Sequence, residues 1–301
     1  NIFGTAAQFS LVGQLSIKEK RAVVIWEQPY LFGIPVETFL NAWLEQEERK
    51  SYSYDRRGVS LSAIRPLSGD EDRLVMLTFR YAETSLFDLQ IAESGVDRQF
   101  FPFSATSISG SFILDRRSDP FNPETGTFFS TALDWAYPLF NSESDYLKLF
   151  SKYQHIFPVM PGFHFSLTAR LGLGRGRMPI HERFFAGGSN SFRGTEFDEL
   201  GPKDPQSLKP VGGKALLLFN FDMIFPILSD LQNLNGAVFY DVGNVISKRR
   251  QVALSGLENS MGFGLRYRTP LGPIRLELAW NLDPPPEKKN PLVIITIGNV
   301  F

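Results

Sequence analysis

The chain has 301 residues, and its 31 Lys and Arg nearly balance its 32 Asp and Glu, which excludes an acidic tail and a strongly basic nucleic-acid-binding surface. Cysteine is absent, so disulfides, thiol nucleophiles and cysteine-ligated metals are excluded. No apolar run reaches the roughly 18 residues of a membrane-spanning helix. Membrane β-strands remain open, because they need only about 10 residues and carry their apolar side chains in alternation.

Alternating apolar and polar residues occupy most of the chain, and this period of two predicts β-strands. Nine such segments precede the stretch 175–213 and five follow it, which gives fourteen firm strands. A shorter candidate at 86–92 would be a fifteenth. The firm segments are 5–16, 21–28, 36–47, 52–64, 73–83, 104–115, 126–135, 145–157, 162–173, 214–226, 235–246, 260–269, 272–282 and 291–301.

The composition of the two strand faces separates a membrane barrel from a soluble sheet. Ile274 and Leu276, for example, share one face of a strand, while Arg275 and Glu277 share the other. Soluble antiparallel sheets also alternate, but their strands are commonly about 5–6 residues long. Many of these segments run about 10–13 residues, which suits a membrane barrel with a polar lumen. The pattern predicts an all-β transmembrane antiparallel barrel formed by a single domain, residues 1–301, with a large soluble β-protein as the alternative.

The segment 175–213 is the longest one without alternation, and a loop of this length inside a compact domain usually carries function. We expect it to fold into the barrel lumen, with Arg193 at its tip. A buried guanidinium needs carboxylate partners, and its planar donor fork suits bidentate pairing. Asp222 and Asp241 lie on the polar faces of the next two strands, so they are the expected partners.

Two neighbours of Arg193 fit the same hypothesis, that of a loop that braces the barrel from inside. Gly194 would let the backbone turn tightly beside the arginine. Phe192 would pack against the barrel wall. The alternative is that Arg193 and Gly194 form a solvated loop tip, and that the two aspartates only line a wet channel.

Patterns that would indicate catalysis or cofactor binding are lacking. His155, His164 and His181 have no metal-ligand spacing, and His164 is expected to face the lumen. The stretch 187–191 lacks the final glycine of a nucleophile elbow. We therefore expect no enzyme activity, no catalytic residue, no cofactor and no metal.

One continuous stretch of the loop reads Phe184-Phe185-Ala186-Gly187-Gly188-Ser189-Asn190-Ser191-Phe192-Arg193-Gly194-Thr195. It resembles the F-x-x-G-G-x-x-S and V/I-R-G-F/Y signature in the sixth extracellular loop of the bacterial surface antigen, or BamA/TamA-like, superfamily of outer-membrane insertase and translocase barrels. Gly187, Gly188 and Ser191 match the supporting part of this signature. Phe192 departs from it, because Val or Ile is usual there, and Thr195 stands where an aromatic residue is usual.

The resemblance extends along almost the whole chain. It includes the segments 1–5, 115–126, 239–243 and 269–273. The C-terminal strand resembles the β-signal read by the same assembly machinery, at Ile295, Ile297, Gly298 and Phe301.

The resemblance implies a barrel of about 16 strands in the bacterial outer membrane, of which this chain supplies about 15. The first strand and the upstream POTRA domains are expected to be missing. The motif arginine of the family pairs with acidic residues on the next two strands, which correspond to Asp222 and Asp241.

The function that the resemblance implies is assembly of β-barrel clients through a lateral seam between the first and last strands. The alternative is a secretion pore for a passenger protein, as in the two-partner-secretion or patatin-fused branch. Expected partners are the lipid bilayer, client or passenger proteins, and periplasmic assembly partners that bind the upstream domains. Nucleic acid is not expected to be a partner.

Overall fold

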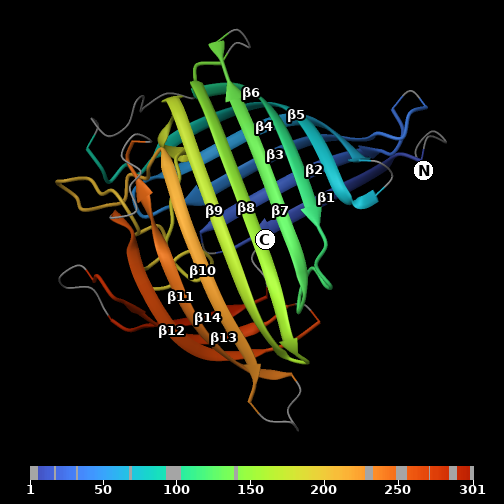
Figure 1. Ribbon diagram of the computed structural model, residues 1–301. Coiled ribbons are helices and arrows are strands. Elements are labelled where there is room, and N and C mark those ends of the chain that lie inside the picture. Colours follow the sequence, from blue (N-terminus) through green and yellow to red (C-terminus); the bar gives the residue numbers. More distant parts are fainter. Residues whose placement is uncertain are drawn as a thin grey trace.

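The structure, a computed structural model, describes residues 6–16, 18–31, 33–67, 70–92, 103–138, 142–227, 233–248, 256–270, 272–284 and 290–298. Within them fourteen strands form one sheet in which each strand pairs antiparallel with the next in sequence (Figure 1). The strands are β1 (Gln8–Leu15), β2 (Glu19–Gln28), β3 (Glu37–Glu48), β4 (Ser53–Leu67), β5 (Asp70–Phe87), β6 (Phe103–Asp115), β7 (Gly126–Ala136), β8 (Asp145–Met160), β9 (Phe163–Arg177), β10 (Ala215–Pro226), β11 (Leu234–Ile246), β12 (Glu258–Tyr267), β13 (Ile274–Asn281) and β14 (Leu292–Ile297). A short 3-10 helix, Ile180–Glu182, lies between β9 and β10. Across these described ranges, no helix is long and apolar enough to cross a membrane.

The all-β architecture with antiparallel neighbours confirms the predicted fold class, but the fifteenth strand candidate is wrong. Strand β5 continues through Phe87, which pairs with Ser53 at the beginning of β4. Residues 88–92 are not in a strand. The apolar residues that suggested a separate strand are therefore the end of a long hairpin.

The predicted loop boundary at 175–213 is also corrected, because β9 continues to Arg177 and β10 begins at Ala215. Gly174 and Gly176 in this extension pair with β8. Pairing with this long neighbouring strand overrides the loop-like composition of the glycine-rich segment. The connection between the two strands, residues 178–214, is called the lumen loop below.

The two faces of the sheet differ as the alternation predicts. Large apolar side chains on the outer face are exposed, with Leu77, Phe263 and Ile295 at 60%, 53% and 70%. Such a surface suits the hydrocarbon region of a bilayer, as in transmembrane barrels. Polar residues such as Asn220 and Glu277 are instead buried on the inner face.

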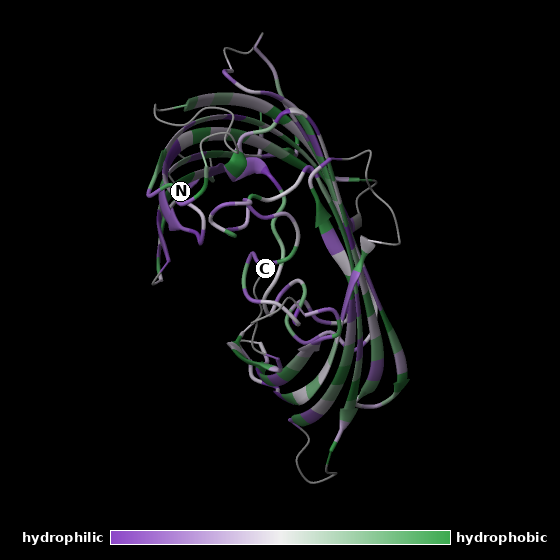
Figure 2. Ribbon diagram, turned by 90° about the vertical axis from the view of Figure 1, so that its left-hand side faces the viewer, coloured by the Kyte–Doolittle hydropathy of each residue, from purple (hydrophilic) through white to green (hydrophobic). Residues whose placement is uncertain are grey.

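The sheet curves into a barrel-like wall that encloses irregular chain, as Figure 2 shows. Its two edge strands are β1 and β14, which are not paired with each other within the described residues. The end of the wall where the lumen loop joins β9 and β10 is called the loop end, and the opposite end is called the turn end. Because every connection reverses direction, the β3–β4 connection lies at the loop end, and the β6–β7 and β12–β13 connections lie at the turn end.

An apolar cluster fixes the lumen loop to the inner wall. Met178, Phe184 and Phe192 from the loop pack with Leu218 of β10 and Val245 of β11, and all five are at most 6% exposed. Burying one such side chain contributes about 1.5–3 kcal/mol. The position of the loop in the lumen is therefore set by packing as well as by charge.

Candidate functional site

A tight turn presents the charged tip of the lumen loop. Gly187 and Gly188 have φ angles of 121° and 86°, a region that favours glycine. The Ser191 hydroxyl closes the turn, because it accepts a hydrogen bond from the Gly187 N–H at 2.8 Å and donates one to the Gly187 carbonyl at 2.9 Å. This turn delivers Phe192 into the apolar cluster and Arg193 to the wall.

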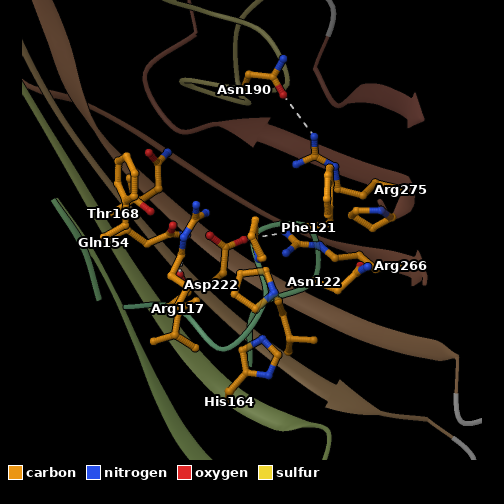
Figure 3. Close-up of a pocket in the computed structure, with 18 of the residues that line it drawn as sticks. Arg117, Phe121, Asn122, Gln154, His164, Thr168, Asn190, Asp222, Arg266 and Arg275 are labelled. Carbon is orange, nitrogen blue, oxygen red and sulfur yellow. Dashed lines mark hydrogen bonds and ion pairs between the residues drawn. The ribbon is translucent and has the colours of Figure 1, made fainter. Parts of the chain in front are cut away.

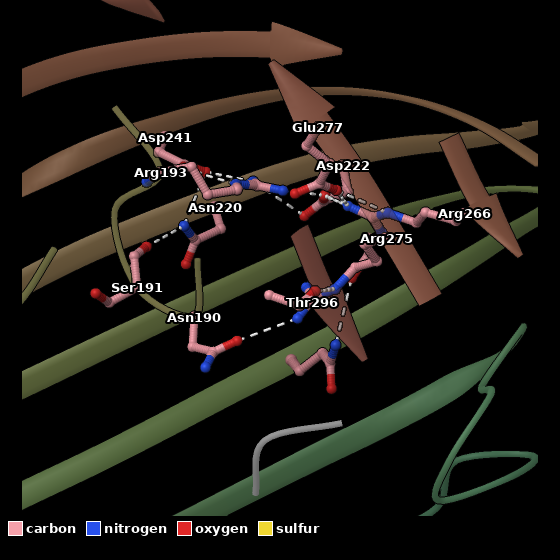
Figure 4. Close-up of polar contacts among 12 residues, drawn as sticks. Asn190, Ser191, Arg193, Asn220, Asp222, Asp241, Arg266, Arg275, Glu277 and Thr296 are labelled. Carbon is pink, nitrogen blue, oxygen red and sulfur yellow. Dashed lines mark hydrogen bonds and ion pairs between the residues drawn. The ribbon is translucent and has the colours of Figure 1, made fainter. Parts of the chain in front are cut away.

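Arg193 lies between the two aspartates that the sequence singled out (Figure 4). Its Nε and Nη2 donate to the Asp241 carboxylate at 2.8 and 2.5 Å, and its Nη1 donates to Asp222 Oδ1 at 2.7 Å. Its backbone N–H also donates to Asp241, at 3.0 Å. The guanidinium lies 3.6 Å from the centroid of the Phe239 ring. Charge, hydrogen bonding and a cation–π contact thus hold a side chain that is only 4% exposed.

The network extends to residues that the sequence reasoning did not assign to the site. Arg266 Nη2 donates to Asp222 Oδ1 at 2.6 Å and to Glu277 Oε1 at 2.7 Å. Asn220 Nδ2 donates to Asp241 Oδ1 at 2.8 Å and to the Ser191 carbonyl at 2.7 Å. These residues lie on the polar faces of their strands, and that parity was the available signal. The loop tip is therefore joined to β10 and β11, and through Arg266 to β12 and β13.

Gly194 is required for a reason different from the predicted tight turn. Its φ angle lies outside the left-handed region. A Cβ atom at this position would lie 2.4 Å from Ser260 Cβ and 3.0 Å from Asn281 Cα. The glycine therefore allows the loop to approach β12 and β13 closely.

A second group of ion pairs fixes the beginning of the lumen loop. Glu182, which is 6% exposed, pairs with Arg56 of β4 and Lys148 of β8, each at 3.0 Å. These strands lie four positions apart in the sheet, so one carboxylate links two distant parts of the wall. Sequence reasoning missed Glu182, since no strand pattern connects a loop residue to particular strands.

Further along, the lumen loop is tied to the β3–β4 connection at the loop end. Lys50 Nζ lies 3.0 Å from Glu199 Oε1, and Lys203 Nζ lies 3.0 Å from Glu199 Oε2. Burial alone would raise the pKa of Glu199, but hydrogen bonds from both lysines lower it to about 2. This carboxylate is therefore ionised at neutral pH.

The remaining candidate residues lie apart from this network. Ile295 and Ile297 are exposed on the outer face of β14. Gly298 follows the strand, and its N–H donates to the Pro273 carbonyl at 3.0 Å. Phe301 lies outside the described residues. Their role as an assembly signal stays a prediction.

The predicted absence of a metal stays an expectation. In the ranges that the structure describes, no group of three or more His, Asp or Glu side chains is arranged to hold a metal ion. His164 is buried on the lumen side, as expected.

The sequence matches one family model and several known proteins. A family model described as the Omp85 superfamily domain matches residues 1–301. The outer membrane protein assembly factor BamA of Nitratidesulfovibrio vulgaris is 24% identical over 289 residues, which cover 94% of this chain and 36% of that protein. The SAM50-like protein of Schizosaccharomyces pombe is 32% identical over 131 residues, covering 39% of this chain and 26% of that protein.

A solved structure of similar shape is BamA from Haemophilus ducreyi lacking POTRA domains 1–3. It has a TM-score of 0.79 and 17% identity, and the match covers 98% of this chain and 64% of that one. This likeness shows that the two chains share a fold. The chain spans about a third of the length of the Nitratidesulfovibrio relative, at 36%.

Proposed function

Because the chain belongs to the Omp85 superfamily, we propose that it is the membrane-embedded part of an outer-membrane factor that assembles β-barrel proteins. Its similarity to BamA and to a SAM50-like protein supports this proposal. The partners are then the lipid bilayer and client β-strands. The bacterial outer membrane is the proposed location, in keeping with the bacterial source of the relative that matches most of the chain. No catalytic residue is needed, since strand pairing forms no covalent bond.

The single observation that carries the proposal is the open edge of β14. This strand pairs with β13 through six residue pairs, and no strand lies on its other side in the described parts of the chain. An edge strand offers unpaired N–H and C=O groups to which another strand can hydrogen-bond. Val293, Ile295 and Ile297 point outward and are 65–79% exposed, so an added strand would continue the apolar outer surface.

The Arg193 network has a supporting role in this proposal. It joins the lumen loop to β10 and β11, and through Arg266 to β12 and β13, the strands next to the open edge. We infer that the loop braces this part of the wall while β14 exchanges partners.

Disulfide trapping tests the seam directly, since the chain has no native cysteine. Thr296→Cys on β14 should form a disulfide with a cysteine in the C-terminal strand of a β-barrel client during assembly. The matched control is Ser109→Cys in β6, in the middle of the wall, which should not form one. Equal crosslinking at both positions would contradict lateral pairing at β14.

A secretion pore for a passenger protein is the second candidate. The lumen loop does not favour a permanently open pore, because it fills part of the lumen and is held there by buried contacts. Single-channel recording in planar bilayers distinguishes the two functions. A stable conductance together with passenger release, without client insertion, would favour the secretion pore.

A further inference from the structure

Beside the Arg193 network, the lumen contains a cavity of about 390 Å³ (Figure 3). The lumen loop borders it at Asn190, and the β6–β7 turn borders it at Asn122. This turn is tied across the turn end, because Asn122 Nδ2 donates to the Thr269 carbonyl at 3.1 Å and Glu124 pairs with Arg268. The cavity therefore lies between two inward-folded segments that are each held by specific contacts.

The lining of this cavity is unbalanced in charge. Among the residues that the structure describes, seven cationic side chains and one carboxylate, Asp222, line it. Four of the cations have carboxylate partners, and these are Arg117, Arg193, Arg266 and Arg268. The other three have no carboxylate within ion-pair distance in the described part of the chain, and these are Lys152, Arg170 and Arg275.

These three cations line the same cavity although like charges repel. Lys152 and Arg170 are directly opposite each other on β8 and β9, where like charges are destabilising. Arg170 Nη2 donates to the Asn190 carbonyl at 3.0 Å, and Arg275 Nη2 donates to Asn190 Oδ1 at 3.1 Å. Two guanidinium groups thus reach the same loop residue, and the ammonium group of Lys152 lies opposite one of them, Arg170, on the neighbouring strand β8.

The side chains of Lys152, Arg170 and Arg275 have more N–H donors than the hydrogen bonds they make with the described residues. Arg170 otherwise bonds to Asn220 Oδ1, and Arg275 to Thr296 Oγ1 at 2.9 Å, so their acceptors among the described residues are all neutral oxygens. A guanidinium has five N–H donors and an ammonium has three. Lys152 Nζ lies 5.3 Å from the centroid of the Phe128 ring. The group of cations is therefore able to accept an anionic ligand without losing an existing ion pair.

A buried histidine gives a second, independent indication of a polar ligand in this cavity. His164 lines it and is 5% exposed, and its Nδ1 has no hydrogen-bond partner among the described residues. A buried polar atom without a partner is uncommon in folded proteins. A ligand or the water bound with it would satisfy this atom.

We propose that this cavity is a phosphate-binding site in which Lys152, Arg170 and Arg275 hold the oxyanion. A single arginine is enough to pair with a carboxylate, as Arg117 does with Asp115. Three cations with unused donors instead match a multiply charged group with several oxygens. The phosphate could belong to a small soluble molecule or to a lipid headgroup, since the recognition chemistry is the same.

Isothermal titration calorimetry of the refolded chain in a non-ionic detergent tests the proposal. Pyrophosphate is the soluble probe, and mixed micelles that contain phosphatidic acid are the lipid probe. Lys152→Gln, Arg170→Gln and Arg275→Gln should each weaken binding by roughly 10- to 100-fold, the range expected for a lost hydrogen bond to a charged group. Lys20→Gln makes the same change in charge on β2, where the residue does not line the cavity, and should have no effect.

A chemical footprint on the unmodified chain keeps the test decisive if a variant does not fold. Bound pyrophosphate should protect Lys152, but not Lys20, from acylation read by mass spectrometry. Binding of phosphatidic acid alone would assign the phosphate to a lipid. No binding of either probe, binding that all three variants retain, or binding of a polyglutamate peptide in place of phosphate would overturn the proposal. Because no client protein is used, failure here is independent of the assembly function.

Discussion

Replacement of Arg193 by Ala tests whether the charge network holds the lumen loop in place. The change removes three side-chain hydrogen bonds of 2.5–2.8 Å and leaves Asp222 and the fully buried Asp241 without their shared guanidinium. Removing one partner of a buried ion pair costs about 3–5 kcal/mol. The equilibrium between docked and undocked loop should therefore shift by roughly 10²- to 10⁴-fold.

A single reporter cysteine measures this shift, because the parent chain has none. Ser260 is fully buried beneath Gly194, so Ser260→Cys should react with a maleimide only when the loop leaves the wall. In the Arg193→Ala background its labelling rate should rise at least about a hundredfold, in line with the lower end of the estimated cost. Lys20→Cys on the exposed part of β2 should label equally in both backgrounds.

Two milder variants, one of a carboxylate and one of the arginine, should give smaller increases in labelling than Arg193→Ala, a ranking that a nonspecific loss of stability would not reproduce. Asp222→Asn should raise the labelling rate of the reporter least, because Arg193 still pairs with Asp241 and Arg266 still pairs with Glu277. Arg193→Lys should restore part of the protection, because a lysine keeps the charge but not the planar fork. The Arg193→Ala protein must first be shown to be folded by its heat-modifiable migration in gel electrophoresis. If the labelling rate of the reporter cysteine is then unchanged, the bracing role is refuted.

Three further predictions concern the other contacts of the lumen loop. Glu182→Gln should lower the free energy of unfolding of the refolded chain by about 3 kcal/mol, because the cationic partners of Glu182 on β4 and β8 lose a buried carboxylate. Urea unfolding monitored by tryptophan fluorescence measures this free energy. Gly194→Ala should expose the Ser260→Cys reporter, since the added Cβ would lie 2.4 Å from Ser260 Cβ, whereas Gly13→Ala, with no heavy atom within 4 Å, should not. Acid should loosen the loop at Glu199. The lowered pKa of this carboxylate stabilises the docked loop fully above the ordinary pKa of 4.5, and this stabilisation is lost as the pH falls through about 2. Faster amide hydrogen exchange at residues 196–203 would show the loss.

The sequence predicts the wall well because alternation has a direct physical cause. A residue such as Phe263 must face lipid if its neighbour faces the lumen, so the period of two is visible without any knowledge of the structure. The ends of strands are less predictable, as at β5 and β9, because they depend on how far the neighbouring strand continues. Composition at a strand end cannot report this.

The site divides in the same way. Arg193, Asp222 and Asp241 could be proposed because a charge in a lumen needs a partner and strand parity shows which carboxylates face inward. Glu182 could not, since its partners on β4 and β8 come together only when the sheet curves. The need for Gly194 was predicted but for another reason, because the close approach that requires it depends on the distance to strands that are remote in sequence.

The distribution of side-chain contacts places the boundary of the rigid wall at β13. Within the described residues, Glu277 on β13 is the last member of the buried ion-pair network, whereas β14 adds only the Thr296 hydroxyl, which accepts from Arg275 at 2.9 Å. Displacing β14 therefore breaks a six-residue backbone pairing and one side-chain hydrogen bond but no ion pair. Displacing β13 would also separate Arg266 from Glu277, and breaking a buried pair adds about 3–5 kcal/mol. Partner exchange at this edge should for this reason involve β14 and stop at β13.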